Sequence, residues 1–111
     1  MFKEVKSMLP VSGNGYDEEI IMHISGAVLD LTRTAHIVLP GSVSITRNET
    51  TGVITDTSTL TDRYVIETIA IYCNMHMFNP PNIEYLERAY KSKKGSLQLS
   101  RHYNGSAVTT E

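Results

Sequence analysis

The sequence has little of several residue types, and each shortage excludes a class of protein. Its 111 residues include one cysteine, Cys73, so no disulfide can form within the chain. We expect a buried thiol in a reducing compartment. No run approaches the roughly 18 apolar residues that span a bilayer, so we predict no membrane segment. The opening stretch, MFKEVKSMLP, lacks the apolar core of a signal peptide.

Positive charge is also scarce. The formal net charge is −2 at pH 7. A free-standing nucleic-acid binder needs a basic face to release counterions from phosphate, so this balance argues against one. It does not argue against a protein that merely surrounds DNA. The 41% hydrophobic and 20% charged content is typical of a globular chain, and the length fits one domain.

One stretch, Tyr64–Phe78, organises the rest of the chain. Eleven of its fifteen residues are apolar, and they fall on every side of a helical wheel. A helix that is apolar all round must be covered by other elements, so we predict a central helix. Thr61 or Asp62 is expected to cap its start. Asn79-Pro80-Pro81 is expected to set its end.

A long helix is predicted from Glu18 to about Val38. Asp17 is suited to cap it, because a side-chain oxygen can accept from the free N–H groups of the first turn. Pro40-Gly41 is expected to stop it. Gly26 costs helix stability, and we interpret it as permitting the close approach of a neighbouring helix.

Two further helices complete the predicted bundle. Phe2–Leu9 has apolar residues at helical spacing and ends at Pro10. Another helix follows Pro81, and the sequence leaves open whether it continues through Gly95. Residues 104–111 are expected to form a flexible tail.

A change of period between the long and central helices predicts a β-hairpin. Ser42–Arg47 alternates, a turn-rich stretch follows, and Val53-Ile54-Thr55 is β-branched, so the expected strands are Ser42–Arg47 and Gly52–Asp56. Two strands alone are marginal in water. The hairpin must therefore lie on the helices, pair with another subunit, or be a mobile arm. The residues assigned to this hairpin or arm are Val43, Ile45, Arg47, Val53 and Ile54.

The predicted fold is thus mainly α: a small helical bundle in one domain, residues 1–103, with a hairpin or extended arm at residues 42–56. The core is expected to gather the apolar residues of three helices. These are Ile20, Ile24, Val28, Leu31, Ile66, Ile69, Ala70, Cys73, Met77, Leu86 and Tyr90.

No catalytic or metal-binding motif stands out. Cys73 and His76 share one helix face, but a structural zinc site needs four ligands, so we interpret the pair as packing. The acidic residues Asp17, Glu18 and Glu19 are explained by the helix start. Phosphate-binding glycine loops, nucleophile elbows and HExxH are absent. We therefore expect no enzyme activity, no metal and no cofactor.

The densest basic run is Lys91, Lys93, Lys94 and Arg101, with Tyr90 and Tyr103 nearby. These side chains could contact phosphate or an acidic protein surface. They could equally form a solvated helix end, where cations are favoured by the helix dipole. The sequence leaves both interpretations open.

Three segments carry a family resemblance. DEEIIMHISGAVLDLTRTA has the spacing Asp-x-x-Ile-x-x-x-Ile-x-x-Ala-x-x-Asp-Leu, and DRYVIETIAIYCNMHMFNPP and IEYLERAYKSKKGSLQLSRHY follow it. In order and spacing they resemble siphophage head–tail connector proteins, the adaptors that bind beneath the portal and are also described as DNA-packaging connectors.

The resemblance implies a non-enzymatic virion protein of the phage neck, assembled in the host cytoplasm. It would form a ring, a dodecamer when assembled, between the portal protein and the next neck (stopper) protein. DNA would pass through without sequence-specific binding, and no membrane is involved. The hairpin would be an inter-subunit or lumenal arm. The C-terminal segment would reach the portal, which makes the expected partner interface Lys91, Lys93, Lys94, Leu97, Leu99, Arg101 and Tyr103.

Two alternatives remain. The first is a small nucleic-acid-binding regulator with a helix-turn-helix-like core. Against it, Asn79-Pro80-Pro81 makes a poor tight turn, and Glu84 and Glu87 would repel phosphate. The second, with less support, is an accessory subunit of an enzyme.

Overall fold

Helices dominate the structure, a computed structural model that describes residues 1–100. In chain order the elements are α1 (Phe2–Ser7), α2 (Asp17–Leu29), η1 (Asp30–Thr34), β1 (Ile45–Arg47), β2 (Ile54–Asp56), α3 (Arg63–Phe78) and α4 (Ile83–Leu99). This confirms the predicted mainly α fold with a hairpin between the long and central helices. Arg101, Tyr103 and the predicted tail at 104–111 lie outside the described residues.

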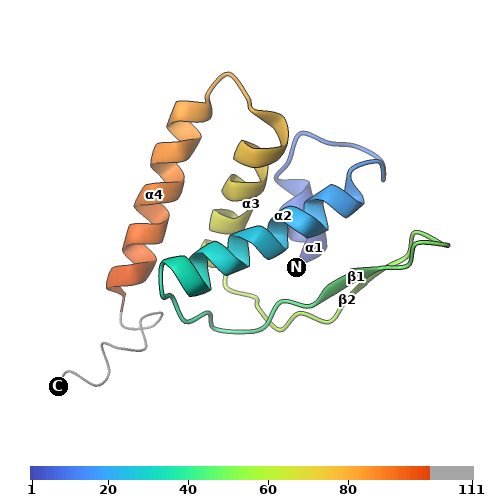
Figure 1. Cartoon of the computed structure of the whole chain (residues 1–111), viewed down its shortest axis with the longest axis horizontal. Coiled ribbons are helices and arrows are strands. Elements are labelled where there is room, and N and C mark those ends of the chain that lie inside the picture. The colour runs from blue at the N-terminus through green and yellow to red at the C-terminus, as the bar shows by residue number, and fades with distance from the viewer. Residues whose placement is uncertain (101–111) are drawn as a thin grey trace.

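The predicted central helix is α3. It contacts α1, α2 and α4, and it lies between α2 and α4 in Figure 1. Asp62 caps it, since its Oδ1 accepts a hydrogen bond from Val65 N–H at 3.2 Å. Asn79, in the left-handed conformation at φ 42°, ends it before the two prolines. Both predicted boundaries are therefore confirmed.

α2 differs from its prediction at both ends. Tyr16 occupies the cap position and Asp17 is the first helical residue. At the other end the helix widens into the π-helical turn η1 and stops at Thr34, short of the predicted Val38. His36 adopts a left-handed φ of 56° and turns the chain away. The helix therefore ends before Pro40-Gly41, because this turn buries Ile37, which is 2% exposed.

Asp17 was predicted as a cap, but it has a different role. It is 4% exposed, and its Oδ1 accepts from Lys6 Nζ at 2.7 Å. A buried carboxylate needs such a partner. The ion pair joins α1 to the start of α2.

The strands of the hairpin are shorter than predicted. β1 pairs antiparallel with β2, with Ile45 opposite Asp56 and Arg47 opposite Ile54. Before β1, the backbone N–H of Ser44 donates to Ser58 Oγ at 2.9 Å instead of to a backbone carbonyl, although the Ser44 carbonyl still accepts from Thr57 N–H. This substitution ends the regular ladder at three residues a strand.

The hairpin lies partly on the helices. Val43, Ile45 and Ile54 are partly buried against the core, whereas Val53 is 59% exposed. Figure 1 shows the hairpin running past the start of α2. Contact with the helices therefore supports one face of this two-stranded unit.

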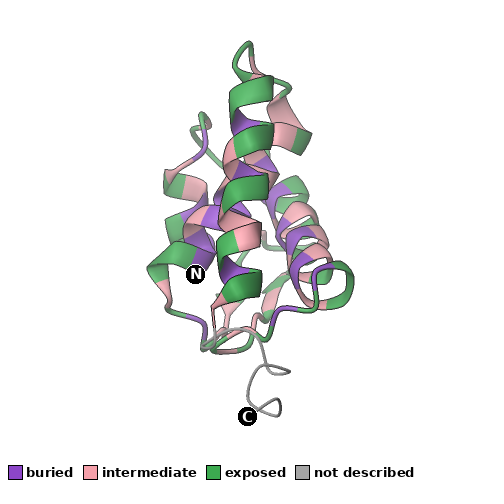
Figure 2. Cartoon of the chain, turned by 90° about the vertical axis from the view of Figure 1, so that its left-hand side faces the viewer, coloured by how far each residue is buried: buried purple, intermediate pink, exposed green. Residues whose placement is uncertain are grey.

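Nine of the eleven predicted core residues are buried. Val28 and Met77 are only partly buried and pack against the edge of the core. Figure 2 shows that each helix mixes buried and exposed residues. The core also takes in Ile37, Leu60 and Leu97, which the sequence analysis did not assign to it.

Gly26 permits the close approach that was predicted. A Cβ added there would lie 3.1 Å from the Tyr72 hydroxyl of α3. The absence of a side chain on α2 therefore makes room for a tyrosine of the central helix.

Candidate assembly surfaces

α4 is joined to the end of α2 by a polar cluster. Asp30, at the junction of α2 and η1, accepts from Tyr90 Oη at 2.5 Å and from Lys94 Nζ at 3.2 Å. Burial and the neighbouring Asp30 carboxylate raise the pKa of Tyr90, so the phenol stays a hydrogen-bond donor. The cluster holds together residues that are sixty or more positions apart in sequence.

Only some residues of the predicted partner interface on α4 are exposed in the structure. Leu97 is 1% exposed within the core, so its assignment to a partner surface is wrong. Lys93 Nζ lies 3.6 Å from Glu67 Oε1, and Lys94 pairs with Asp30. Lys91 and Leu99 are exposed, Leu99 at 87%. Arg101 and Tyr103 lie outside the described residues.

The five residues of the predicted arm also differ in their surroundings. Arg47 Nη1 lies 3.8 Å from Glu18 Oε2 at the start of α2. Val43, Ile45 and Ile54 contribute to the protomer's own packing. Only Val53 among the five presents a mostly exposed apolar side chain. The hairpin therefore offers its tip region, rather than a whole face, to another molecule.

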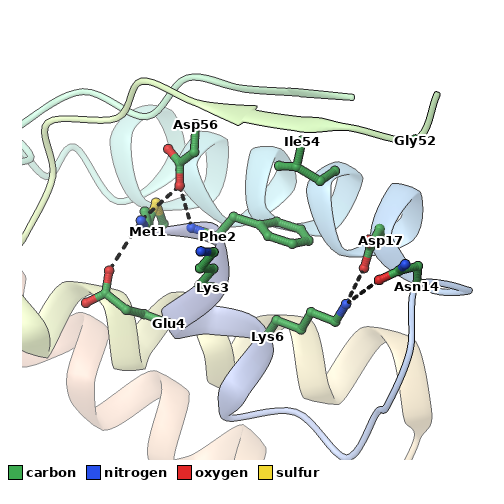
Figure 3. A pocket seen from close by; sticks show the side chains of 10 residues that line it. All are labelled: Met1, Phe2, Lys3, Glu4, Lys6, Asn14, Asp17, Gly52, Ile54 and Asp56. Carbon is green, nitrogen blue, oxygen red and sulfur yellow. Dashed lines mark hydrogen bonds and ion pairs between the residues drawn. The ribbon is translucent and has the colours of Figure 1, made fainter. Parts of the chain in front are cut away.

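A groove of about 550 Å³ lies between α1 and β2. Figure 3 shows Phe2 and Ile54 along it, with Asp56 at one end and the Lys6–Asp17 pair at the other. Asp56 Oδ2 accepts from Phe2 N–H at 2.7 Å and lies 2.9 Å from the N-terminal ammonium. The groove follows the interface between the hairpin and α1, where these contacts of Asp56 hold the two elements together.

Burial of Asp56 opposes its charged form. Hydrogen bonds from Phe2 N–H, the N-terminal ammonium and Ser58 outweigh that burial and hold the pKa of the carboxyl well below its usual range. The sequence analysis missed this role. Nothing in the polar sequence from Asp56 to Thr61 distinguishes Asp56 from its neighbours as an anchor.

The outer face of α2 carries exposed apolar side chains. Met22 is 60% exposed and Leu29 is 49% exposed, and Ser25 lies exposed between them. Glu18 and Arg33, also exposed, stand before and after these residues at helical spacing. The sequence analysis assigned Ile20, Ile24, Val28 and Leu31 to the core but did not assign the outer face of this helix. The spacing of Met22 and Leu29, two turns apart, was the available signal.

Cys73 and His76 do not come together as a site. Cys73 is fully buried, and burial raises the pKa of its thiol to about 12. His76 is exposed and lies against the Tyr72 ring, with centroids 4.1 Å apart. Within residues 1–100 no three side chains of the metal-binding types are grouped so that they could hold an ion.

The described chain is a small helical bundle with a hairpin, and its exposed apolar side chains include Met22 and Leu29 on α2, Leu99 on α4 and Val53 beside the hairpin turn. A sequence model described as phage connector protein matches residues 1–104, and the chain belongs to that family. No curated protein and no solved structure matches the chain.

Membership makes the chain a structural phage protein, and a component of the virion at the head–tail junction that associates with other capsid and tail proteins. The family is not a known enzyme family, and it does not favour the nucleic-acid-binding alternative. Among the described helices, none combines the length and apolar character needed to cross a bilayer.

Proposed function

We propose that the chain is a head–tail adaptor that forms a ring beneath the portal, around the channel through which DNA passes. The observation that carries this proposal is the family match, which covers nearly the whole chain. The ring, a dodecamer, extends the portal and receives the next neck protein. Subunits gather on the portal after synthesis in the host cytoplasm.

A ring requires two different, complementary faces on each protomer, because each subunit contacts its neighbours head to tail. α4 and the hairpin tip lie at opposite ends of the molecule (Figure 1). Both ends carry exposed apolar side chains: Tyr85 and Leu99 on α4, and Val53 beside the turn of the hairpin. These two ends supply the two faces in our proposal.

The portal contact falls to the end of α4. Leu99 and Lys91 remain available there, whereas Leu97 is occupied by the core. Arg101 and Tyr103 continue this segment in sequence. The proposal thus keeps the C-terminal contact with the portal that the sequence predicted, with fewer residues of α4.

The test is assembly with the portal protein of the same phage, followed by electron microscopy of the purified complex. We expect a closed ring of this chain on one face of the portal. Leu99→Asp and Val53→Asp should each reduce ring occupancy, because a charge would be placed in an apolar contact. Thr46→Asp, at an exposed position of β1, is the matched control and should leave assembly unchanged.

Circular dichroism of each variant separates failed assembly from failed folding. If the folded wild-type chain associates with neither the portal nor the next neck protein under any condition, the adaptor proposal is wrong.

A further inference from the structure

The outer face of α2 carries a sequence of side chains that is complementary to the same sequence read in the opposite direction. Glu18, Met22, Ser25, Leu29 and Arg33 follow one another at spacings of four, three, four and four residues. Such spacings place the first four on one face of α2. Arg33 follows Leu29 by four residues in η1, whose wider π-helical turn brings it back to the same side. All five are exposed in the protomer. The stripe therefore begins with an acidic residue and ends with a basic one. Between them, one apolar residue lies on each side of the small central Ser25.

We propose that this stripe binds the same stripe of a second copy, with the two α2 helices antiparallel. In that arrangement Glu18 of each copy faces Arg33 of the other, and Met22 faces Leu29. Ser25 lies close to the two-fold axis, where a small side chain lets the helices approach. Every exposed member of the stripe then has a complementary partner, as an isologous contact requires.

The shape of the surface agrees with this pairing. A hollow of about 270 Å³ lies beside Ser25, Val28, Leu29 and Val43. It is adjacent to Leu29, where the register brings the Met22 side chain of the second copy. Methionine is flexible and suited to filling such an irregular apolar hollow.

The charges are available for the contact. Glu18 has one neighbour of opposite charge, Arg47, at 3.8 Å, yet its side chain remains 82% exposed. Arg33 is exposed at the end of η1. Parallel helices would place like charges together at both ends of the stripe, so the charge pattern selects the antiparallel arrangement.

This pairing concerns the free chain and does not rest on the proposed ring. A two-fold contact is complete at two copies and by itself does not extend into a larger assembly. It would cover the apolar stripe of α2 in subunits that are not yet part of a virion.

The experiment is sedimentation equilibrium of the purified full chain over a wide concentration range, at low and physiological salt. We expect a reversible monomer–dimer equilibrium. Glu18→Arg and Arg33→Glu should each raise the dimer dissociation constant roughly tenfold, because each homodimer then places two like-charged pairs together. Glu19→Arg, at the same helix end but off the stripe, is the matched control and should change it little.

Mixing supplies the decisive measurement. When Glu18→Arg and Arg33→Glu chains are combined, the heterodimer regains two opposite-charge pairs, so its affinity should return to near the wild-type value. A wild-type chain that stays monomeric at every concentration would overturn the proposal. So would an oligomer whose stability is unaffected by these variants, or one that mixing does not restore. Circular dichroism checks that each variant is folded.

Discussion

At the scale of single residues, Asp30 links α2 to α4. Its carboxylate accepts from Tyr90 and Lys94 of α4, and it stands where α2 becomes the π-helical turn. One side chain thus links the irregular end of one helix to the middle of another. Hydrogen bonds to a charged group contribute more than those between neutral groups.

Tyr90→Phe tests this link. The substitution removes one hydroxyl and keeps the ring in the core, so the loss reports mainly the hydrogen bond to Asp30. We expect the free energy of unfolding to fall by about 1.5 kcal/mol, measured by urea denaturation. Tyr85→Phe removes the same hydroxyl from a side chain that is 64% exposed, and should change stability by less than about 0.5 kcal/mol. Equal effects of the two variants would show that the cluster adds nothing.

At the scale of elements, the hairpin depends on its attachment to α1. Asp56 is the last residue of β2, and its carboxylate accepts a hydrogen bond from Phe2 N–H. This hydrogen bond joins residues that are 54 positions apart in sequence. A two-stranded sheet is marginal on its own, so the stability of the hairpin should follow the charge of Asp56.

The pKa of Asp56 is depressed in the folded chain from an ordinary value of 3.8. The ionised carboxylate therefore stabilises the fold above the unfolded-state pKa, and this contribution is lost as pH falls toward the folded-state pKa. We expect the melting temperature of the wild type, followed by circular dichroism from about pH 5 to about pH 2, to fall more steeply than that of Asp56→Asn. Glu49→Gln changes an exposed acid beside the hairpin turn and should retain the wild-type slope. Identical slopes for Asp56→Asn and the wild type would contradict the anchor.

The elements that could be predicted are those whose cause is local. The apolar excess of Tyr64–Phe78 required a covered helix, and the Asp62 cap and the Asn79-Pro80-Pro81 break depend on neighbours in sequence. The turn of the hairpin is similar: Asn48 Oδ1 accepts from Thr50 N–H at 2.9 Å, and Gly52 adopts a φ of 76°.

The elements that could not be predicted depend on distant contacts. The early end of α2 requires the left-handed His36 and the burial of Ile37, neither of which helix propensity indicates. Leu97 was assigned to a partner because the family resemblance implies a C-terminal contact with the portal, yet the fold places it in the core. Asp17 suited a cap, but Lys6 of α1 lies close enough to pair with it. In each case tertiary contact outweighed a local preference.

At the scale of the whole molecule, several positively charged side chains form ion pairs within the chain, which leaves them less suited to bind DNA. Lys6, Lys93, Lys94 and Arg63 all lie within 4 Å of a carboxylate of the same chain. Cations engaged in this way are less available to phosphate. The formal net charge of −2 points in the same direction. A subunit with this balance can surround DNA without holding it, because few counterions would be released on contact.

A direct measurement of DNA binding tests whether these paired cations leave the chain with little affinity for DNA. We expect the purified chain to bind duplex DNA more weakly than about 10⁻⁴ M at physiological salt, by fluorescence anisotropy, because its net charge is −2 and several of its described cations pair with carboxylates. The variant carrying both Glu84→Lys and Glu87→Lys removes two exposed acids beside Arg88 and Lys91 on α4. It should bind measurably and lose affinity as salt increases, because it presents a row of cations along one helix. Tight, salt-sensitive binding by the wild type would instead favour a nucleic-acid-binding role and would count against a channel through which DNA slides.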